Sequence, residues 1–431
     1  MAKAKQHTDA ESNKEAISEV LGNFTAPLSN ESEESATGKK RLLSLFSGCG
    51  GMDIGFEGGF ICNRKSVNPE SGWIEQDVNA DWVKLRPTQF KTIFANDILE
   101  EAKNSWISYM VPRGHAPETY HFGSIVDYVK DFRDGKTAFP TDIDIVTGGF
   151  PCQDFSVAGK RKGFESNKDH TGKLSESIPS EETRGKLYFW MKQVIDITRP
   201  KVFVAENVKG LMNLGDVKTI IQNDFANAAE AGYIVLTPRV LHAANFGVPE
   251  SRERVIFIGL RKDALREEAI EALEKEEVPD EYNPYPSPTH GYNAPGKNLM
   301  TPVVCGDVFK DLAEPEDSAD LSQSNYSKAK YMGSHCQGQK EISLGKIGPT
   351  IRSEHHGNIE YRRLSAEHGG EIDDELKRGL KERRLTPREC ALIQTFPPDY
   401  KFVRRTTAAS NSRFVVSASG AYKVIGNAVP P

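Results

Sequence analysis

Six short apolar runs between residues 41 and 262 constrain the fold of this chain more than any other feature of its sequence. Continuous runs of four or five apolar residues are typical of strands buried on both faces of a parallel sheet. Between two of the runs, Leu187, Trp190, Val194 and Ile197 recur at helical spacing, and Pro200 ends that helix. Strands that alternate with helices predict an α/β fold with a doubly wound sheet. The runs are Leu42–Phe46, Thr92–Ala95, Ile143–Val146, Val202–Ala205, Tyr233–Leu236 and Val255–Ile258.

The rest of the chain divides by composition. Residues 1–39 are polar and poor in aromatic residues, which predicts a disordered or loosely helical tail. Residues 263–282 are predicted to form a charged surface helix, and four prolines in Asn283–Pro295 indicate a boundary. Residues 296–383 have no clear periodicity, so a smaller irregular domain is expected there, before a helical pattern returns near Leu385.

Composition excludes several classes of protein. No apolar run reaches the roughly 18 residues of a membrane span. The six cysteines form no Cys-x-x-Cys pair, so no metal site is expected. They are too sparse for a disulfide scaffold, which predicts a reducing, cytoplasmic location. The net charge of −6 does not decide whether the chain binds nucleic acid, because one face can still be basic.

Chemically versatile residues directly follow four of the predicted strands. These are a glycine turn at 47–51, Asp97, a Gly-Gly-Phe-Pro-Cys-Gln segment at 148–153, and Glu206. Ligands bind beyond the carboxyl ends of strands in open α/β sheets. The sequence therefore predicts that these groups converge on one edge. The glycine turn alone is a weak signal, because Asp53 stands where a dinucleotide-binding motif has its third glycine, and a plain strand–helix turn explains it about as well.

Cys152 and Glu206 are the candidate catalytic residues. Cys152 follows Pro151 and two glycines and could act as a thiolate nucleophile, although a buried structural cysteine is the commoner case. Burial of Glu206 at a strand end would favour its protonated form, as a general acid requires; capping of the next helix is the alternative. Arg252 and Arg254 alternate into a strand and are expected to point to one face, where they suit carbonyl or phosphate recognition.

Taken together, these segments resemble the DNA cytosine-5 methyltransferases of the prokaryotic restriction–modification type. The resemblance covers residues 42–431 apart from about 275–383. Its ordered motifs are Phe-Ser-Gly-Cys-Gly-Gly (46–51), Gly-Gly-Phe-Pro-Cys-Gln-Asp-Phe-Ser (148–156), Arg-Gly-Lys-Leu-Tyr-Phe (184–189), Glu-Asn-Val-Lys-Gly (206–210), Asn-Phe-Gly-Val-Pro-Glu-Ser-Arg-Glu-Arg (245–254), Leu-Thr-Pro-Arg-Glu-Cys (385–390) and Ile-Gly-Asn-Ala-Val-Pro-Pro (425–431).

The resemblance implies a function and a division into domains. Residues 40–275 would be the catalytic domain with the Rossmann-like sheet of S-adenosylmethionine-dependent methyltransferases, 276–383 a target-recognition domain, and 384–431 a return segment that completes the catalytic domain. The enzyme would methylate C5 of a cytosine flipped out of double-stranded DNA. Cys152 would add to C6 of the base, Glu206 would protonate N3, and Arg254, with Arg252, would hold O2.

The resemblance also implies binding residues. The cofactor S-adenosylmethionine, whose product is S-adenosylhomocysteine, would contact the glycine turn, the ends of two strands, the segment before Cys152 and the C-terminal motif. DNA would contact Gln153 and Ser156 beside Cys152, and Arg352 and Arg362 in the recognition domain. A monomer is expected, with a cognate restriction endonuclease as a possible partner. The expected cofactor contacts are Phe46, Ser47, Gly48, Gly50, Gly51, Asp97, Ile98, Ser124, Phe150, Pro151 and Asn427.

The chain departs from the family pattern at several points. Ser124 replaces an aspartate that contacts the cofactor's adenine, and Glu250 replaces a glutamine. Residues 165–183 are an insertion, and the sequence ends at Pro431, where the family usually continues with a helix. Two alternatives stay open: an RNA (tRNA) cytosine-5 methyltransferase, and a non-catalytic DNA-binding relative. The intact set of Cys152, Glu206, Arg252 and Arg254 disfavours the second.

Overall fold

A mixed sheet of eight strands forms the centre of the protein in the computed structural model. The structure describes residues 38–151, 187–213, 216–294, 296, 298–353, 358–406 and 413–431. The predicted tail therefore lies outside the described residues up to position 37, as does the 165–183 insertion. Main-sheet elements are β1 (Lys40–Leu45), α2 (Gly51–Glu57), β5 (Phe90–Asp97), α3 (Glu100–Met110), β6 (Tyr120–Phe122), α4 (Ile125–Arg133), β7 (Ile145–Gly149), α5 (Leu187–Thr198), β8 (Val202–Val208), α6 (Val217–Ala226), β9 (Tyr233–Val235), β10 (Arg239–His242) and β11 (Glu253–Arg261).

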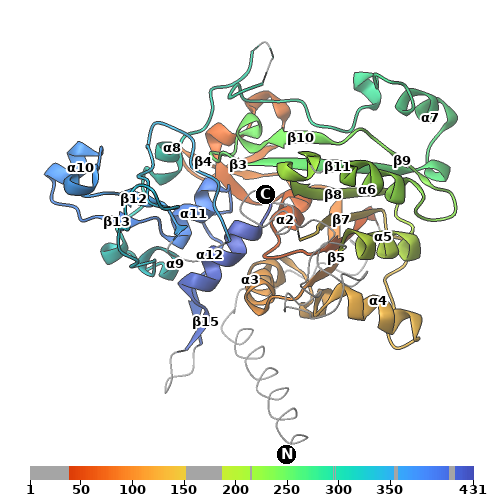
Figure 1. Cartoon of the computed structure of the whole chain (residues 1–431), viewed down its shortest axis with the longest axis horizontal. Helices are drawn as coiled ribbons and strands as arrows, with labels where there is room; N and C mark the ends of the chain where they lie inside the picture. The colour runs from red at the N-terminus through yellow and green to blue at the C-terminus, as the bar shows by residue number, and fades with distance from the viewer. Residues whose placement is uncertain are drawn as a thin grey trace, which may run out of the picture.

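All six apolar runs are strands of this sheet, as predicted. The order is β10-β11-β8-β7-β1-β5-β6, and β9 also pairs with β11. The five strands from β8 to β6 are parallel. β11 runs antiparallel to β8, β9 and β10, so the sheet is mixed and the parallel arrangement typical of such apolar runs holds for the strands from β8 to β6. Figure 1 shows β10, β11 and β8 lying side by side.

Helices cover both faces of the sheet, which makes it doubly wound. One apolar cluster joins strand residues such as Leu43, Phe94 and Phe203 to α4, α5 and α6. A second cluster lies against α2 and α3 on the other face. The predicted helix around Trp190 is α5, whose buried side includes Met191 and Val194. No helix among the described residues is long and apolar enough to cross a membrane.

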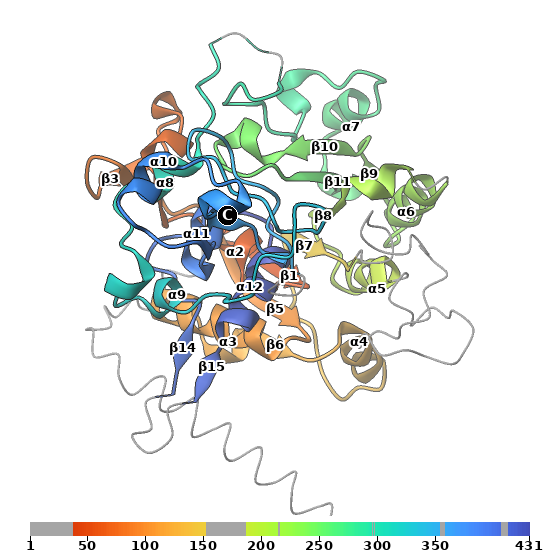
Figure 2. The same ribbon diagram turned by 60° about the vertical axis from the view of Figure 1, so that its left-hand side comes forward.

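A small antiparallel sheet lies between α2 and β5, where the sequence predicted no strand. It has the order β2-β4-β3. Its contacts reach far along the chain, because Lys65 pairs with Asp307 at 2.5 Å and Lys310 pairs with Asp81 at 2.8 Å. Figures 1 and 2 show this sheet beside α8. The bounds are β2 (Ile61–Asn63), β3 (Ile74–Asp77), β4 (Trp82–Leu85) and α8 (Cys305–Phe309).

The second half of the chain consists of short elements. The charged helix predicted over 263–282 is shorter: α7 spans Glu267–Leu273 and packs Leu273 against the sheet edge. α11 confirms the helical pattern near Leu385 and begins with a capping box of Thr386 and Glu389. The remaining elements are α9 (Leu321–Ser324), β12 (Tyr361–Arg363), α10 (Asp373–Lys377), β13 (Arg383–Arg384), α11 (Pro387–Ile393), β14 (Arg404–Arg405), β15 (Phe414–Val416) and α12 (Ala418–Asn427).

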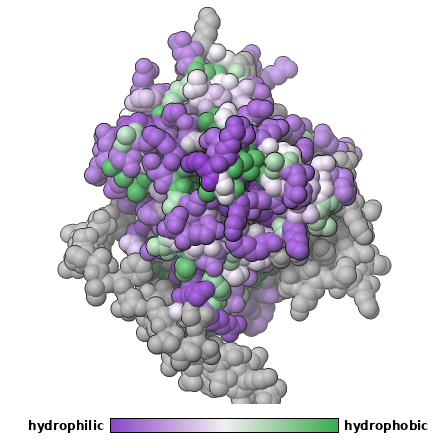
Figure 3. All heavy atoms as spheres, turned by 90° about the vertical axis from the view of Figure 1, so that its left-hand side faces the viewer, coloured by the Kyte–Doolittle hydropathy of each residue, from purple (hydrophilic) through white to green (hydrophobic). Residues whose placement is uncertain are grey.

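One apolar cluster is continuous across residues 275 and 383, and the division into domains stays a prediction. This cluster joins Val303, Phe309 and Ile359 to Trp106 in α3 and to Tyr422 in α12. The region expected as a recognition domain is therefore packed directly onto the main body. Its surface on the α10 side is mostly hydrophilic (Figure 3).

Candidate active site

The groups predicted to converge do meet at one edge of the sheet. β8, β7, β1 and β5 are neighbours and parallel, so their carboxyl ends lie together. Leu45 pairs with Gly148 on one side and with Asn96 on the other. Gly149 pairs with Glu206. The register thus places the glycine turn, Asp97, the segment before Cys152 and Glu206 side by side.

Glu206 and Arg254 form the charged pair of this edge. Arg254 Nε lies 2.8 Å from Glu206 Oε1, and both side chains are largely buried. The two residues are diagonal neighbours across the antiparallel β8–β11 ladder. The second oxygen of Glu206 lies against Gly149, where an added Cβ would be 2.8 Å from Oε2. The Glu206 carboxylate is therefore held on one side by Arg254 and on the other by the backbone before Cys152.

The backbone leading to Cys152 is tied to the residue after Glu206. Asn207 donates from Nδ2 to the carbonyl of Phe150 at 3.2 Å, and Phe150 is buried. Asn207 has no predicted role beyond its place in the Glu-Asn-Val motif. Pro151 is the last described residue before the gap at 152–186. The predicted residues Cys152, Gln153 and Ser156 lie outside the described residues, so their roles stay predictions.

The glycine turn adopts a backbone that few residues other than glycine tolerate. Gly48 has φ +56° and Gly50 has φ +85°. A Cβ on Gly50 would lie 2.7 Å from the Trp106 ring, whereas the space in front of Gly48 is open. Gly51 packs against the carbonyl of Val429. The space along the Cβ direction is thus open at Gly48 and filled at Gly50 and Gly51.

Asp97 holds the turn in place. Its Oδ2 accepts from the Gly48 N–H and its Oδ1 from the Leu99 N–H, each at 3.0 Å. Burial raises the pKa of Asp97 above its ordinary value, and these backbone hydrogen bonds oppose that shift. A carboxylate oxygen that accepts one hydrogen bond can accept another. Asp97 can therefore also bind a ligand hydroxyl.

The other predicted cofactor residues differ in their exposure and contacts. Ile98 is 37% exposed, and Phe122, opposite Asp97 on β6, is 53% exposed. Phe46 has φ 52°, and the Ser47 side chain donates to Ser44. The Ser124 hydroxyl accepts from the Val126 N–H and caps α4. Asn427 is exposed at the end of α12. An open turn, a carboxylate and exposed apolar side chains fit an adenosine-containing cofactor.

Arg252 does not share the position of Arg254, contrary to expectation. Its side chain is 2% exposed and donates to the carbonyls of Ile351, Gly426 and Ala428. A guanidinium with these partners is turned into the protein. The expectation that both arginines point to one base-binding face is therefore wrong for Arg252 in this structure.

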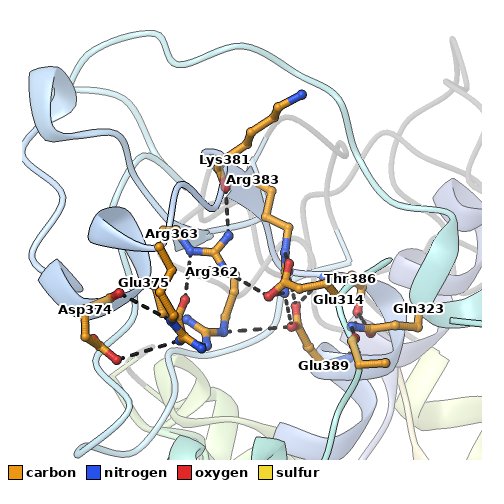
Figure 4. Close-up of polar contacts among 12 residues, drawn as sticks. Glu314, Gln323, Arg362, Arg363, Asp374, Glu375, Lys381, Arg383, Thr386 and Glu389 are labelled. Carbon is orange, nitrogen blue, oxygen red and sulfur yellow. Dashed lines mark hydrogen bonds and ion pairs between the residues drawn. The ribbon is translucent and has the colours of Figure 1, made fainter. Parts of the chain in front are cut away.

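The two arginines expected to contact DNA have different surroundings. Arg352 is about one-third exposed and pairs with Glu360 at 3.2 Å. Arg362 is 7% exposed and pairs with Glu375 at 2.6 Å (Figure 4). An arginine buried in an ion pair cannot reach a base without breaking that pair. The predicted DNA contact of Arg362 is therefore not supported.

Asp53 lies buried beneath the glycine turn. Trp106 donates from Nε1 to Asp53 Oδ2 at 2.7 Å. Burial raises the pKa of Asp53 to about 7, and hydrogen bonds from Ser44 and Trp106 only partly oppose this shift. Sequence reasoning treated Asp53 only as the residue in place of a third glycine.

Asp53→Asn is expected to stabilise the protein at pH 8 but not near pH 4. Folded Asp53 keeps its proton up to about pH 7, whereas the unfolded carboxyl loses it near pH 4. Stability is therefore lost as the pH rises between these values, and the neutral amide avoids that loss, about 1–3 kcal/mol above pH 7. Urea unfolding of both proteins at pH 4.5 and pH 8 measures it. An equal difference at both pH values would contradict the assignment.

The fold and the edge together define an α/β enzyme with a nucleotide-type cofactor turn and a carboxylate–guanidinium pair beside it. The sequence profile of the C-5 cytosine-specific DNA methylase family matches residues 40–431. The chain is 32% identical over 401 residues to the type II methyltransferase M.BsuRI of Bacillus subtilis, covering 91% of this chain and 77% of that one. It is 30% identical to M.BspRI of Lysinibacillus sphaericus, over 96% and 84%.

A solved structure supports the fold. A mutant of Spodoptera frugiperda DNMT2 superposes with a TM-score of 0.51 at 16% identity, covering 91% of this chain and 96% of that one. The chain belongs to the C-5 cytosine-specific DNA methylase family and is an enzyme of the DNA (cytosine-5)-methyltransferase type. Members of this family use S-adenosylmethionine, and their substrate is DNA.

Proposed function

We propose that this protein is a sequence-specific modification methyltransferase that transfers a methyl group from S-adenosylmethionine to C5 of cytosine in double-stranded DNA. The observation that carries the proposal is the Glu206–Arg254 pair at 2.8 Å, held against Gly149 three residues before Cys152. Family membership and the type II methyltransferases among its relatives support it.

The chain's own residues divide the chemistry as follows. C5 of cytosine is a weak nucleophile, so the ring must first be activated. The Cys152 thiolate adds to C6 and forms a C–S bond, while the protonated form of Glu206 gives its proton to N3 and Arg254 holds O2. The electron pair of the former C5–C6 double bond then makes C5 nucleophilic, and C5 takes the methyl group. A water molecule takes the C5 proton, which restores the C5–C6 double bond and expels the thiolate, and N3 returns its proton to Glu206.

The glycine turn, Asp97 and Asn427 are proposed to hold the cofactor. The open space at Gly48 admits the part of the cofactor that contacts the protein backbone. Asp97 can accept a further hydrogen bond from a cofactor hydroxyl. S-adenosylmethionine, when bound, supplies a methyl group on a sulfonium and leaves as S-adenosylhomocysteine. The exposed side chain of Ile98 offers an apolar contact for its adenine.

The region around Lys330 is proposed to contribute to DNA binding. Residues 321–340 carry three lysines and a histidine and no Asp or Glu, within a chain of net charge −6. All three lysines are exposed. Buried Arg384 donates to the carbonyls of Ala329 and Gly338, which anchors the loop between them. Lysines on an anchored loop are suited to contact DNA phosphates. Such contacts would offset the cost of base flipping, which is on the order of a few kcal/mol.

The proposal extends to the biological setting. A chain of this type would act as a monomer in the bacterial cytoplasm, and a cognate restriction endonuclease would cut the same site when it is unmethylated. Support comes from the bacterial relatives M.BsuRI and M.BspRI, which are type II methyltransferases. Arg352, Gln153 and Ser156 are retained as proposed DNA contacts.

Methyl transfer to defined substrates tests the proposal. The wild-type protein and Cys152→Ala are incubated with labelled S-adenosylmethionine and either genomic DNA or tRNA. Label in DNA from the wild type only is the expected result. Label in tRNA alone would favour an RNA methyltransferase, and DNA binding without label would favour a non-catalytic relative. A covalent adduct with duplex DNA that carries 5-fluorocytosine at the mapped target site would report the bond to Cys152 directly.

A further inference from the structure

Arg252 connects three segments that are far apart in the sequence. Its Nη1 donates to the Ile351 carbonyl at 3.2 Å and lies 3.4 Å from Glu250 Oε1. Its Nη2 donates to the carbonyls of Gly426 at 3.2 Å and Ala428 at 2.5 Å. Burial, with Arg254 nearby, lowers the pKa of Arg252 to about 10, so the guanidinium stays charged at neutral pH. One cation thus binds β11 to residues about 100 and 175 positions away.

Glu250 completes this junction. It is fully buried, and its Oε1 also accepts from the Ile351 N–H at 2.7 Å. The adjacent backbone supports the same contact, because the Ser251 N–H donates to the Gly348 carbonyl at 2.8 Å. The chain around Arg252 is therefore fastened to residues 348–351 by both side-chain and backbone hydrogen bonds.

Two of the three carbonyls that Arg252 binds, those of Gly426 and Ala428, flank Asn427. Gly426 and Ala428 are buried, whereas Asn427 between them is exposed. On its inner side, Gly426 packs so closely on the backbone of Arg352 that no Cβ would fit. Val429, one residue further, places its carbonyl against Gly51 of the glycine turn. A continuous series of contacts thus runs from Arg252 through 426–429 to the proposed cofactor turn.

The same arginine lies two residues from Arg254. β11 begins at Glu253, so Arg252 precedes its first residue, and Arg254 is paired with Glu206. Any shift of the C-terminal segment relative to Arg252 would therefore change the spacing between the proposed cofactor contacts and the charged pair. Methyl transfer depends on that spacing to within about 1 Å.

We propose that Arg252 is a positioning residue that couples cofactor binding to the Glu206–Arg254 pair, by clasping the 426–428 carbonyls and the Ile351 carbonyl to the start of β11. The proposal rests on the proposed function for the identity of the cofactor. It assigns Arg252 no contact with the base.

Arg252→Lys tests the clasp, because an ammonium group cannot span carbonyls on two different segments. S-adenosylhomocysteine is used as the probe of equilibrium binding, since it undergoes no turnover. We expect its affinity to fall by about tenfold or more, equivalent to roughly 1.4 kcal/mol or more, while DNA affinity changes by less than about threefold. At saturating S-adenosylmethionine the bound cofactor itself holds the 426–429 segment in place and restores the spacing, so the single-turnover rate should stay within about threefold of the wild type.

Arg388→Lys is the matched control. Arg388 is also buried, donating to Asp320 at 2.6 Å and to the Pro397 carbonyl, but it belongs to no part of the proposed site. It should lose thermal stability without losing affinity for S-adenosylhomocysteine. Unchanged affinity in Arg252→Lys would overturn the proposal. So would a single-turnover rate at saturating cofactor that falls as far as that of Arg254→Lys, which would place Arg252 on the base.

Hydrogen exchange of the wild-type protein keeps the test available if Arg252→Lys does not fold. S-adenosylhomocysteine should slow exchange at the amides of Ser251 and Ile351, which lie in the clasp, as well as in the glycine turn. Protection confined to the turn and to Asn427 would overturn the proposal. Failure of the proposed function looks different: the wild type would bind S-adenosylhomocysteine with these effects but transfer no methyl group to DNA.

Discussion

Glu206→Gln is expected to lower the rate of methyl transfer by about 10²- to 10⁴-fold, the usual contribution of a positioned general acid. The amide has the same shape and can still accept from Arg254 Nε, which the carboxylate does at 2.8 Å. It cannot transfer a proton to N3 of the base. Single-turnover kinetics at saturating DNA and S-adenosylmethionine measure the chemical step, and affinity for both ligands should change little.

Glu253→Gln is the control for this substitution. Glu253 is the residue directly before Arg254, and its partly exposed carboxylate pairs with Lys209 at 2.8 Å. Its backbone carbonyl, which accepts from Arg254, is unaffected by the change. The rate of Glu253→Gln should match the wild type within about twofold, since exposed ion pairs contribute little. A Glu206→Gln rate above a tenth of wild type would contradict the general-acid role.

The sequence predicted the functional edge because every step depended on local patterns. Each apolar run marked one buried strand, and parallel neighbours must bring their carboxyl ends together. Asp97 and Glu206 each fall on the last residues of a strand, so their convergence followed from topology alone. The contact between Glu206 and Gly149 agrees with the small residue that precedes Phe150 in the motif.

Contacts between distant segments were not predictable in this way. Arg252 and Arg254 alternate along the chain, which suggests one shared face, but Arg252 precedes β11 and its backbone turns toward residue 351. The carbonyls that attract it belong to segments with no distinguishing pattern. Likewise, Arg362 looked like a surface residue of a polar segment, and its burial depends on Glu375, which lies in a separate short helix. The β2–β4–β3 sheet was missed because β3 has no buried residue and β4 has one.

The largest expected effect on stability lies in the ionic cluster around Glu389. Figure 4 shows its arginines and carboxylates pointing toward one another. Arg383 donates to both oxygens of Glu389, at 2.8 and 2.9 Å, and the Thr386 N–H donates to Oε2. Glu314 binds Arg363 and Arg383 together, and Arg383 holds the pKa of Glu314 below its ordinary value. The cluster joins α11 to β13 and to residue 314.

Glu389→Ala is expected to lower the free energy of unfolding by about 3–5 kcal/mol, because it leaves the buried Arg383 with only the half-buried Glu314 as a charged partner. Urea unfolding measures the loss. Lys377→Ala, which breaks an ion pair with Asp373 whose side chains are both 74% exposed, should cost less than about 1 kcal/mol.

The double variant Arg383→Met/Glu389→Met separates two explanations of that loss. If the penalty comes from an uncompensated buried charge, removing both charges should restore most of the stability, because apolar side chains of similar volume can replace a buried pair at little cost. If the loss comes from the Thr386–Glu389 capping box at the start of α11, the double variant should stay as unstable as Glu389→Ala. A cap alone contributes about 0.5–2 kcal/mol, so we expect recovery to within roughly that amount of the wild type.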